Sequence, residues 1–282
     1  MQADVPSDGT RRFGDLKLRV LSGVAAAVLG GVLLWLGGVW AMALIALVTG
    51  AMIWEFRAMT LTVDGVSGRT DVPILIGAVI GAVIVSHFYG IQVGARWLLW
   101  SLVIGAFADL LVKRRRAMSW GLVGGTLIGA AGIALLYLRG LDTLGFETAL
   151  WVLLVVIGAD IGGYFAGRIF GGPKLWPRVS PNKTWSGALG GIVLASLLGA
   201  AVSAGIEGSN LALVVAISAL VAVIAQAGDL AESAVKRHFG VKDSGVLMPG
   251  HGGALDRFDG LITAALAVAA VVWFHGDTIL LW

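Results

Sequence analysis

The sequence predicts an all-α, polytopic integral membrane protein with about nine transmembrane helices and a cytosolic N-terminus. Its residues are 58% hydrophobic and only 13% charged, whereas a soluble domain carries roughly 25% charged residues. Apolar runs reach the ~17–25 residues that a membrane helix requires, and most basic residues gather on one side of these runs. Glycine, with 42 of 282 residues, is abundant, as expected where membrane helices pack through small side chains.

The apolar runs define the candidate spans in order. We place them at about 20–37, 39–54, 73–90, 96–112, 120–138, 147–167, 185–204, 210–228 and 260–276. The first two are so close that they form either a tight hairpin or one partly re-entrant unit. No processing site follows the first run, so it is not interpreted as a cleaved signal peptide. We expect a disordered basic segment at 1–18, N-terminal transmembrane helices at 19–145, and a C-terminal transmembrane region at 146–282 that carries the candidate site.

The basic residues set the predicted orientation. Nine spans with an inside N-terminus place all but Arg96 and Arg139 of the 20 Lys and Arg residues on the cytosolic side. Residues 113–116, KRRR, are interpreted as a topological anchor, with Asp109 paired to Lys113 one helical turn away. Basic charge on a membrane face favours anionic lipid headgroups and cytosolic phosphate compounds as partners, and not nucleic acid.

Acidic residues cluster near the cytosolic ends of the sixth, eighth and ninth spans. They are Asp160, Asp229, Glu232, Asp243, Asp256 and Asp259. Ionisable groups within spans are rare and indicate a functional site by default. Asp160, the deepest of them, fits either such a site or an ion pair between helices. The absence of Cys excludes thiolate ligands and nucleophiles.

The loop between the sixth and seventh spans, GGPKLWPRVSPNKTWSG, is rich in polar groups. It supplies the candidate substrate-binding residues Ser180, Asn182, Lys183 and Thr184. One interpretation is a turn followed by a helix cap. The other is a phosphate site, formed by backbone donors at a helix N-terminus together with Lys and Thr.

The segment from Gln226 to Gly260 carries the strongest constellation. Spacings of three and four place four polar residues along one helix face, namely Asp229, Glu232, Ser233 and Lys236. Asp256 and Asp259 share one side of the first turn of the ninth helix, where a carboxylate would complement the helix dipole. That structural role explains one carboxylate but not two flanking Arg257. Carboxylates from two helices suit a hard cation such as Mg²⁺ completed by substrate phosphates, and His251 is less suited to Zn²⁺ because no second His lies at ligand spacing.

The same segment resembles the signature of the phosphatidate cytidylyltransferase family, also called the CDP-diacylglycerol synthases. The resemblance lies in Ser233-Ala-Val-Lys236-Arg237, Lys242-Asp243, Gly245, Pro249, His251-Gly-Gly253 and Asp256-Arg257-Phe258-Asp259, with GADIGGYFAGR and SPNKTWSG upstream. It spans roughly residues 150–260. This sequence departs from the pattern at Met248 and Ala254, which are apolar exchanges, and at Ser186, where an acidic residue or Gln is common; the role of Ser186 is left open.

The resemblance implies transfer of CMP from CTP to phosphatidate, with Mg²⁺ and room for a second cation. It assigns Asp229 and Asp256 to the metal, with Asp259 and Asp160 linked to the metal either directly or through its ligands. The expected catalytic set is Asp229, Lys236, Asp256 and Asp259. The expected substrate-binding residues are Asp160, Ser180, Asn182, Lys183, Thr184, Ser233, Arg237, Lys242, Asp243, His251, Gly252, Gly253 and Arg257. Membrane lipids are expected partners and a homodimer is expected from the glycine-rich spans and the family, in a bacterial inner membrane with a cytosolic active site.

Other functions are compatible with parts of the pattern. A related CTP-dependent transferase acting on another lipid phosphate or a polyprenol would share the reaction class. A CDP-alcohol phosphotransferase would require a DGxxAR segment, which this chain lacks. A secondary transporter with Asp160 and Asp229 as a proton relay would predict inverted repeats and a site at the membrane midplane, whereas the charges gather at one face.

Overall fold

The computed structural model describes residues 23–61, 71–111, 115–245, 247 and 252–282, and the side chains of 61, 71 and 108–119 lie outside that description. The described chain is almost entirely helical. An apolar helix over Gly23–Leu36 comes first. It is followed by α2 (Gly38–Leu61), α3 (Asp71–Tyr89), α4 (Ile91–Leu111), α5 (Arg115–Arg139), α6 (Gly145–Phe170), α7 (Trp185–Ala204), α8 (Leu211–His238), α9 (Leu255–His275) and a short 3-10 turn, η1 (Ile279–Leu281).

Within the described residues, 7 helices are long and apolar enough to cross a membrane. They are Gly38–Thr60, Val72–Tyr89, Trp120–Arg139, Gly145–Phe170, Trp185–Ala204, Leu211–His238 and Leu255–His275. The apolar helices Gly23–Leu36 and Ile91–Phe107 are shorter. The polytopic membrane class is therefore confirmed, and each predicted span overlaps a helix within the described residues. The count of nine crossings stays a prediction.

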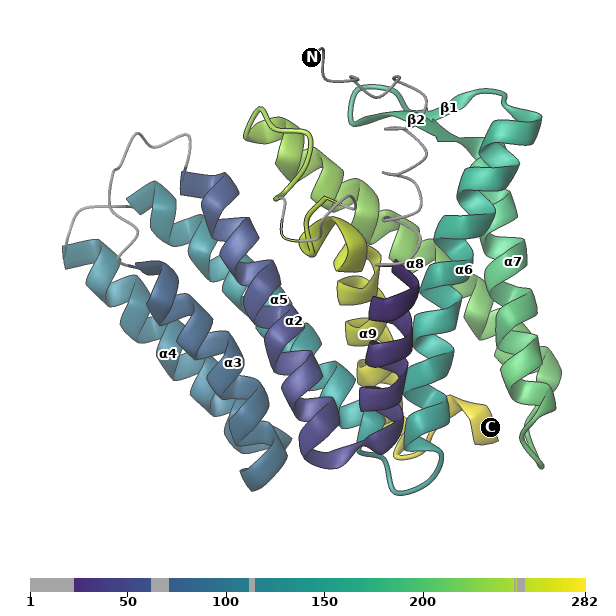
Figure 1. The fold of residues 1–282 in the computed structure, drawn as a ribbon, viewed down its shortest axis with the longest axis horizontal. Helices are drawn as coiled ribbons and strands as arrows, with labels where there is room; N and C mark the ends of the chain where they lie inside the picture. Colours follow the sequence, from purple (N-terminus) through teal and green to yellow (C-terminus); the bar gives the residue numbers. More distant parts are fainter. Residues whose placement is uncertain (1–22, 62–70, 112–114, 246, 248–251) are drawn as a thin grey trace, which may run out of the picture.

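The helices form two groups joined through α9 (Figure 1). One group contains α2 to α5 and the other contains α6 to α8, with α9 contacting α2 and α5 as well as α6 and α8. A core around the fully buried Trp151 fills the second group, and a separate core around Ile53 and Val79 fills the first. Because α9 borders both groups, its first turn lies within reach of the N-terminal helices.

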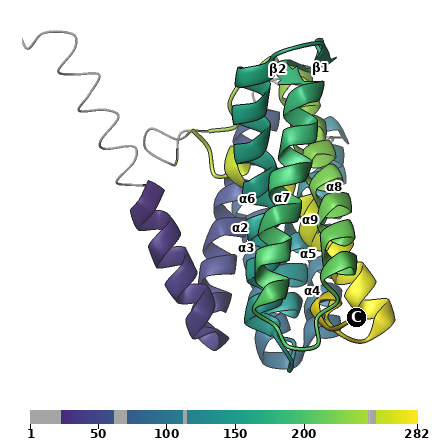
Figure 2. The ribbon, with the colours of Figure 1, turned by 90° about the vertical axis from the view of Figure 1, so that its right-hand side faces the viewer.

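The helix over Gly23–Leu36 and α2 form a hairpin, one of the two arrangements expected from the sequence (Figures 1 and 2). The chain turns at Gly37 and Gly38, whose φ angles of 68° and 49° favour residues without a Cβ. Arg139 at the end of α5 fastens this turn, since its Nε donates to the carbonyl of Leu34 at 2.6 Å and Nη2 donates to that of Trp35 at 2.9 Å.

Glycines bring α6 and α7 into close contact. A Cβ at Gly162 would lie 2.5 Å from the carbonyl oxygen of Gly190, and one at Gly190 would lie 2.1 Å from the Cβ of Ala166. Backbones that approach this closely gain dispersion contacts. These contacts can hold two helices together in lipid, where the hydrophobic effect does not drive their association. This pairing fixes the end of α6 beside the start of α7, where the chain between them emerges.

The sequence predicted a plain loop between α6 and α7. In the structure this segment contains a small hairpin. Strands β1 (Lys174–Trp176) and β2 (Ser180–Thr184) pair antiparallel, with Lys174 opposite Thr184 and Trp176 opposite Ser180. Pro177 falls in the turn between them, where its missing N–H disturbs no ladder. The hairpin covers the end of the bundle at which α6 ends and α7 begins (Figure 2).

Described basic residues lie at both ends of the bundle, and which end faces the cytosol stays a prediction. Arg139 ends α5 and Arg96 lies in the first part of α4, at the end of the bundle opposite the hairpin. Arg168 near the end of α6 and Lys236 near the end of α8 lie at the hairpin end. The predicted pair of Asp109 and Lys113 lies outside the described residues.

Candidate active site

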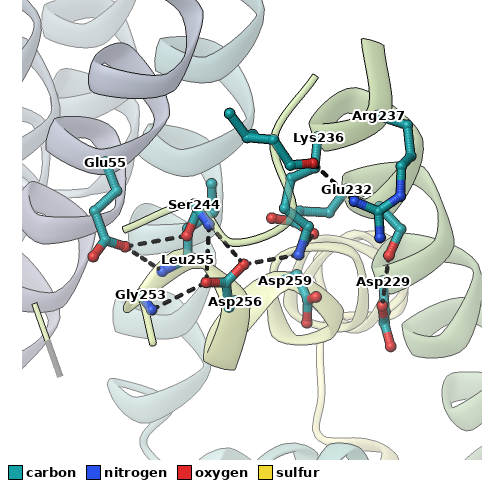
Figure 3. A network of polar contacts seen from close by, with 12 residues as sticks. Glu55, Asp229, Glu232, Lys236, Arg237, Ser244, Gly253, Leu255, Asp256 and Asp259 are labelled. Atoms are coloured by element: carbon teal, nitrogen blue, oxygen red, sulfur yellow. Dashed lines mark hydrogen bonds and ion pairs between the residues drawn. The ribbon is translucent and has the colours of Figure 1, made fainter. Parts of the chain in front are cut away.

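Charged residues from three separate parts of the chain meet at the hairpin end of the bundle. They come from β2, from the last turns of α8, and from the first turn of α9 with the residues before it. Figure 3 shows the residues of α8 and α9. The hairpin of β1 and β2 is held over this end by α7. Its Thr184 caps α7 by accepting from Gly187 N at 3.1 Å, and Ser186 donates through its hydroxyl to the carbonyl of Gly171.

Lys183 on β2 forms an ion pair with Asp229 on α8. Both side chains are about three-quarters buried, and Asp229 also accepts from the hydroxyl of Ser233 at 3.4 Å. The sequence predicted Lys183 and Asp229 to belong to one site but did not predict their contact. The pair ties the hairpin to α8 and places a cation directly beside the carboxylate expected to bind metal.

Lys236 bridges two carboxylates at the end of α8. Its Nζ lies 2.6 Å from Glu232 Oε2, one turn earlier on α8, and 2.7 Å from Asp256 Oδ1 on α9. All three side chains are only about a tenth exposed. Buried charges of this kind persist when each is paired, so this triad fixes the end of α8 against the start of α9.

Asp256 organises the segment that precedes α9. Besides the bond from Lys236, it accepts from the backbone N–H of Ser244 at 3.0 Å and from that of Gly253 at 3.0 Å. These donors use most of the acceptor capacity of one carboxylate. Asp256 therefore acts as an anchor for the loop in this arrangement, a role that its place in the first helical turn only partly indicated.

Asp259 lies one turn further into the bundle and is 9% exposed. Asp229, Glu232 and Asp160 all repel its charge, so four carboxylates share one neighbourhood. One oxygen of Glu232, Oε1, is buried without a hydrogen-bond partner among the described residues. Within the described part of the chain, no three His, Cys, Asp or Glu side chains form a ready-made metal cage. The neighbourhood is strongly acidic and is only partly neutralised by Lys183 and Lys236.

The remaining predicted residues occupy different positions. Asp160 is exposed on α6 and interacts electrostatically with Asp229, Lys183 and Arg257. Arg237 donates to the carbonyl of Val241 at 2.8 Å and so supports the turn after α8.

The other predicted substrate-binding residues range from exposed to buried, and one lies outside the described residues. Asn182, Lys242, Asp243 and Arg257 are exposed, Ser180 and Gly252 are half-buried, and Ser233 and Gly253 are buried. His251 lies outside the described residues. For Thr184, the helix-cap interpretation is confirmed by its bond to Gly187, and Ser186, left open by the sequence, supports the end of α6.

Glu55 is a member of this network that the sequence interpretation missed. It lies on α2, is 2% exposed, and accepts from the backbone N–H of Leu255 at 2.9 Å. A single acidic residue inside an apolar run was a usable signal, because an intramembrane carboxylate is expensive unless it has a function or a partner. Its partner lies 200 residues away in the sequence, where no local pattern could connect the two.

The fold and the site together define a polytopic membrane protein with a charged site, rich in carboxylates and lysines, at one end of its C-terminal helices. Such a site suits the binding of phosphates and a hard cation. The model of the cytidylyltransferase family matches residues 17–275, so the chain belongs to that family. The membership expected from the motifs is thereby confirmed.

Proteins named phosphatidate cytidylyltransferase resemble the chain over most of its length. Those of Brucella suis and Brucella abortus are each 37% identical to it over 258 residues, which is 90% of this chain and 92% of the relative. The protein of that name from Helicobacter pylori is 44% identical over 130 residues, covering 46% of this chain and 48% of the relative.

Proposed function

We propose that the protein is a phosphatidate cytidylyltransferase, which uses CTP and phosphatidate to form CDP-diacylglycerol and pyrophosphate. The observation that carries this proposal is the similarity to the Brucella proteins of that name over nine tenths of both chains. The family match over residues 17–275 includes every residue of the site described above. Relatives in bacteria and the one-sided basic charge support an inner-membrane location with the site facing the cytosol.

The reaction needs positioning and charge neutralisation more than it needs a strong base. A phosphate oxygen of phosphatidate forms a bond to the α-phosphorus of CTP, and the bond to the bridging oxygen breaks so that pyrophosphate leaves with its electron pair. The attacking oxygen is already anionic near neutral pH. The protein therefore has to bring two polyanions together and stabilise the leaving oxygens.

Lys183 and Lys236 are the residues best placed for that task. Each is held at the site by carboxylates, Lys183 by Asp229 and Lys236 by Glu232 and Asp256. A triphosphate entering beside them would replace a carboxylate as the partner of a lysine. The lysine ammonium group would then neutralise negative charge on the substrate. Arg257 interacts electrostatically with Asp160 and would add a further positive charge at the exposed edge of the site.

We propose Mg²⁺ as the cofactor, and the donor chemistry of the site fits it. Asp229, Asp259 and Glu232 offer carboxylate oxygens, and Oε1 of Glu232 has no hydrogen-bond partner in the part of the chain that the structure describes. Mg²⁺ usually takes one or two carboxylates beside waters and substrate phosphates. Asp256, also expected as a ligand, would join only by giving up one of its present donors. When bound, the ion would neutralise charge on the reacting phosphates. A second cation and a homodimer stay predictions.

The test is an assay of purified protein with phosphatidate vesicles, radiolabelled CTP and Mg²⁺. We expect labelled CDP-diacylglycerol from the wild type, loss of at least roughly a hundredfold in kcat for Asp229→Asn, and full activity for Glu207→Gln. Glu207 is exposed beyond the far end of α7 and serves as the matched control. Absence of any CDP-lipid, or full activity of Asp229→Asn, would overturn the proposal.

Two further arms of the same assay separate the alternatives. Chelation of Mg²⁺ is expected to stop the reaction, and restoring Mg²⁺ to recover it; turnover that persists in chelator would refute the cofactor. Replacing phosphatidate by an isoprenoid glycerol phosphate or a polyprenol tests the related transferases. Product formed only with those lipids would assign the protein to them, and solute flux without nucleotide consumption would indicate a transporter.

A further inference from the structure

We propose that Glu55 on α2 is a positioning residue of the active site, whose carboxylate binds Ser244, Leu247 and Leu255 and thereby fixes the first turn of α9. This role makes one residue of the N-terminal helices part of the site's framework. The kinetic part of its test rests on the proposed function, and the structural part does not.

The contacts of Glu55 are made with both ends of that segment. Oε2 accepts from Leu255 N at 2.9 Å and from the hydroxyl of Ser244 at 3.4 Å, and Oε1 accepts from Leu247 N at 3.4 Å. The carboxylate is buried, so these bonds compensate for the loss of its hydration. One side chain therefore holds three points of the loop against α2.

The carboxylate of Asp256 on α9 also binds this loop. Asp256 accepts from the backbone N–H groups of Ser244 and Gly253, while Glu55 accepts from the hydroxyl of Ser244 and the N–H of Leu255. Ser244 is thus bonded to both carboxylates, one from α2 and one from α9 (Figure 3). The two acids bracket the loop, and Asp256 in turn holds Lys236.

Two glycines make room for Glu55. A Cβ at Gly245 would lie 2.3 Å from Glu55 Oε1, and a Cβ at Gly253 would lie 2.6 Å from Oε2. Neither glycine has a positive φ, so the backbone conformation alone does not require glycine at these positions. The close approach of the loop to the carboxylate does require it, which gives a physical reason for two glycines in the motif.

Glu55 also supplies what the start of α9 lacks. The residue before the helix, Ala254, has no side chain that could cap it, and the first N–H groups of a helix need acceptors. Glu55 accepts the first of them, from Leu255, and its negative charge faces the positive end of the helix dipole. Because Asp256 follows in that same turn and Asp259 lies one turn further along the helix, the position of this first turn affects both carboxylates.

The kinetic test compares Glu55→Gln, Glu55→Asp and Thr49→Val. An amide keeps the size of the side chain but offers one acceptor oxygen and no charge, so Glu55→Gln is expected to lower kcat roughly 10–100-fold. The KM for CTP should stay within about twofold, because Glu55 touches the loop and not the nucleotide. Glu55→Asp keeps the charge and should recover part of kcat. Thr49, equally buried on α2 but bonded to its own helix at Ile45, should tolerate Val.

Hydrogen exchange supplies a readout that does not depend on activity. In Glu55→Gln the amides of Leu247 and Leu255 should exchange at least tenfold faster than in the wild type, with the rates across α6 and α7 unchanged. Exchange at the wild-type rate in the loop, or a uniform rise over all helices, would overturn the proposal, as would an unchanged kcat. If the wild type forms no CDP-lipid, the proposed function fails and the exchange data alone still decide the role of Glu55.

Discussion

Lys236 and Asp256 are joined by a 2.7 Å hydrogen bond between the last turn of α8 and the first turn of α9. Both side chains are about nine-tenths buried, and Glu232 lies on the other side of the lysine. The bond therefore ties together the two helices that carry most of the acidic residues of the site. The lysine therefore has a structural role at this contact, whatever its role toward phosphate.

Replacing Lys236 by Met should destabilise the protein strongly. The change leaves Glu232 and Asp256 buried beside each other without their shared cation, and removing one partner of a buried ion pair costs about 3–5 kcal/mol. The readout is the apparent unfolding midpoint in detergent. Lys242→Met, at an exposed position in the same segment, is the matched control and should lie within about 0.5 kcal/mol of wild type. Equal midpoints for the two variants would show that the triad contributes nothing.

Neighbouring glycines of α6 should respond in opposite ways to alanine. A Cβ at Gly162 would meet the carbonyl of Gly190 at 2.5 Å, whereas one at Gly163 would lie 3.6 Å from the carbonyl of Gly187, an ordinary contact. Gly162→Ala should therefore separate α6 from α7 and lower the unfolding midpoint. Gly163→Ala should be neutral or stabilising, because Ala is favoured over Gly within a helix by about 1 kcal/mol.

The comparison uses thermal unfolding of both variants in the same detergent. Activity is not a suitable readout, since Asp160 lies on the same stretch of helix. A midpoint that falls equally for both variants would mean that general helix propensity or expression, and not the close contact with Gly190, governs this position.

Ser218→Ala should destabilise the second core although it removes a single oxygen. The N–H of Trp151 donates to Ser218 Oγ at 2.9 Å, and both side chains are fully buried. Deleting the acceptor leaves that N–H without a partner, which costs about 1–3 kcal/mol. In a Trp151→Phe background the same Ser218→Ala change should cost much less, because the donor is gone. Additive effects of the two changes would contradict the hydrogen bond as the cause.

Gly245→Ala should impair the loop through Glu55. The new methyl would lie 2.3 Å from Glu55 Oε1 and 2.7 Å from its Cγ, so either the loop or the carboxylate must shift. We expect lower kcat and faster amide exchange at Leu255. Combining Gly245→Ala with Glu55→Asp, which withdraws the carboxylate by one methylene, should restore part of the exchange protection. A double variant that is worse than both single ones would argue for a different cause of the damage.

Local signals in the sequence were sufficient for the membrane class, the approximate helix positions and the family. Apolar runs such as that of α8 reveal helices because burial in lipid requires a continuous apolar stretch. Asp256 and Asp259 could be placed on one side of a first helical turn by spacing alone. The motifs around Lys236 and Asp256 also indicated the family, because such a motif is a fixed order of residues.

Contacts between segments were beyond the reach of these signals. The short hairpin after α6 was expected as a loop, because a strand of three residues has no periodicity to detect. The separate N-terminal and C-terminal regions expected from the sequence are bridged by Glu55 and Leu255. The apolar sequence around Glu55 does not indicate which distant backbone N–H group will donate a hydrogen bond to its carboxylate.

The sequence by itself determined that this chain is a helical membrane protein of the cytidylyltransferase family, since composition, period and residue order are local properties. Only the tertiary structure decided which charges neutralise each other: Lys183 with Asp229, Lys236 with Glu232 and Asp256, and Glu55 with the loop before α9. Those choices depend on how whole helices pack, because a buried charge takes as its partner whichever group the packing brings within reach.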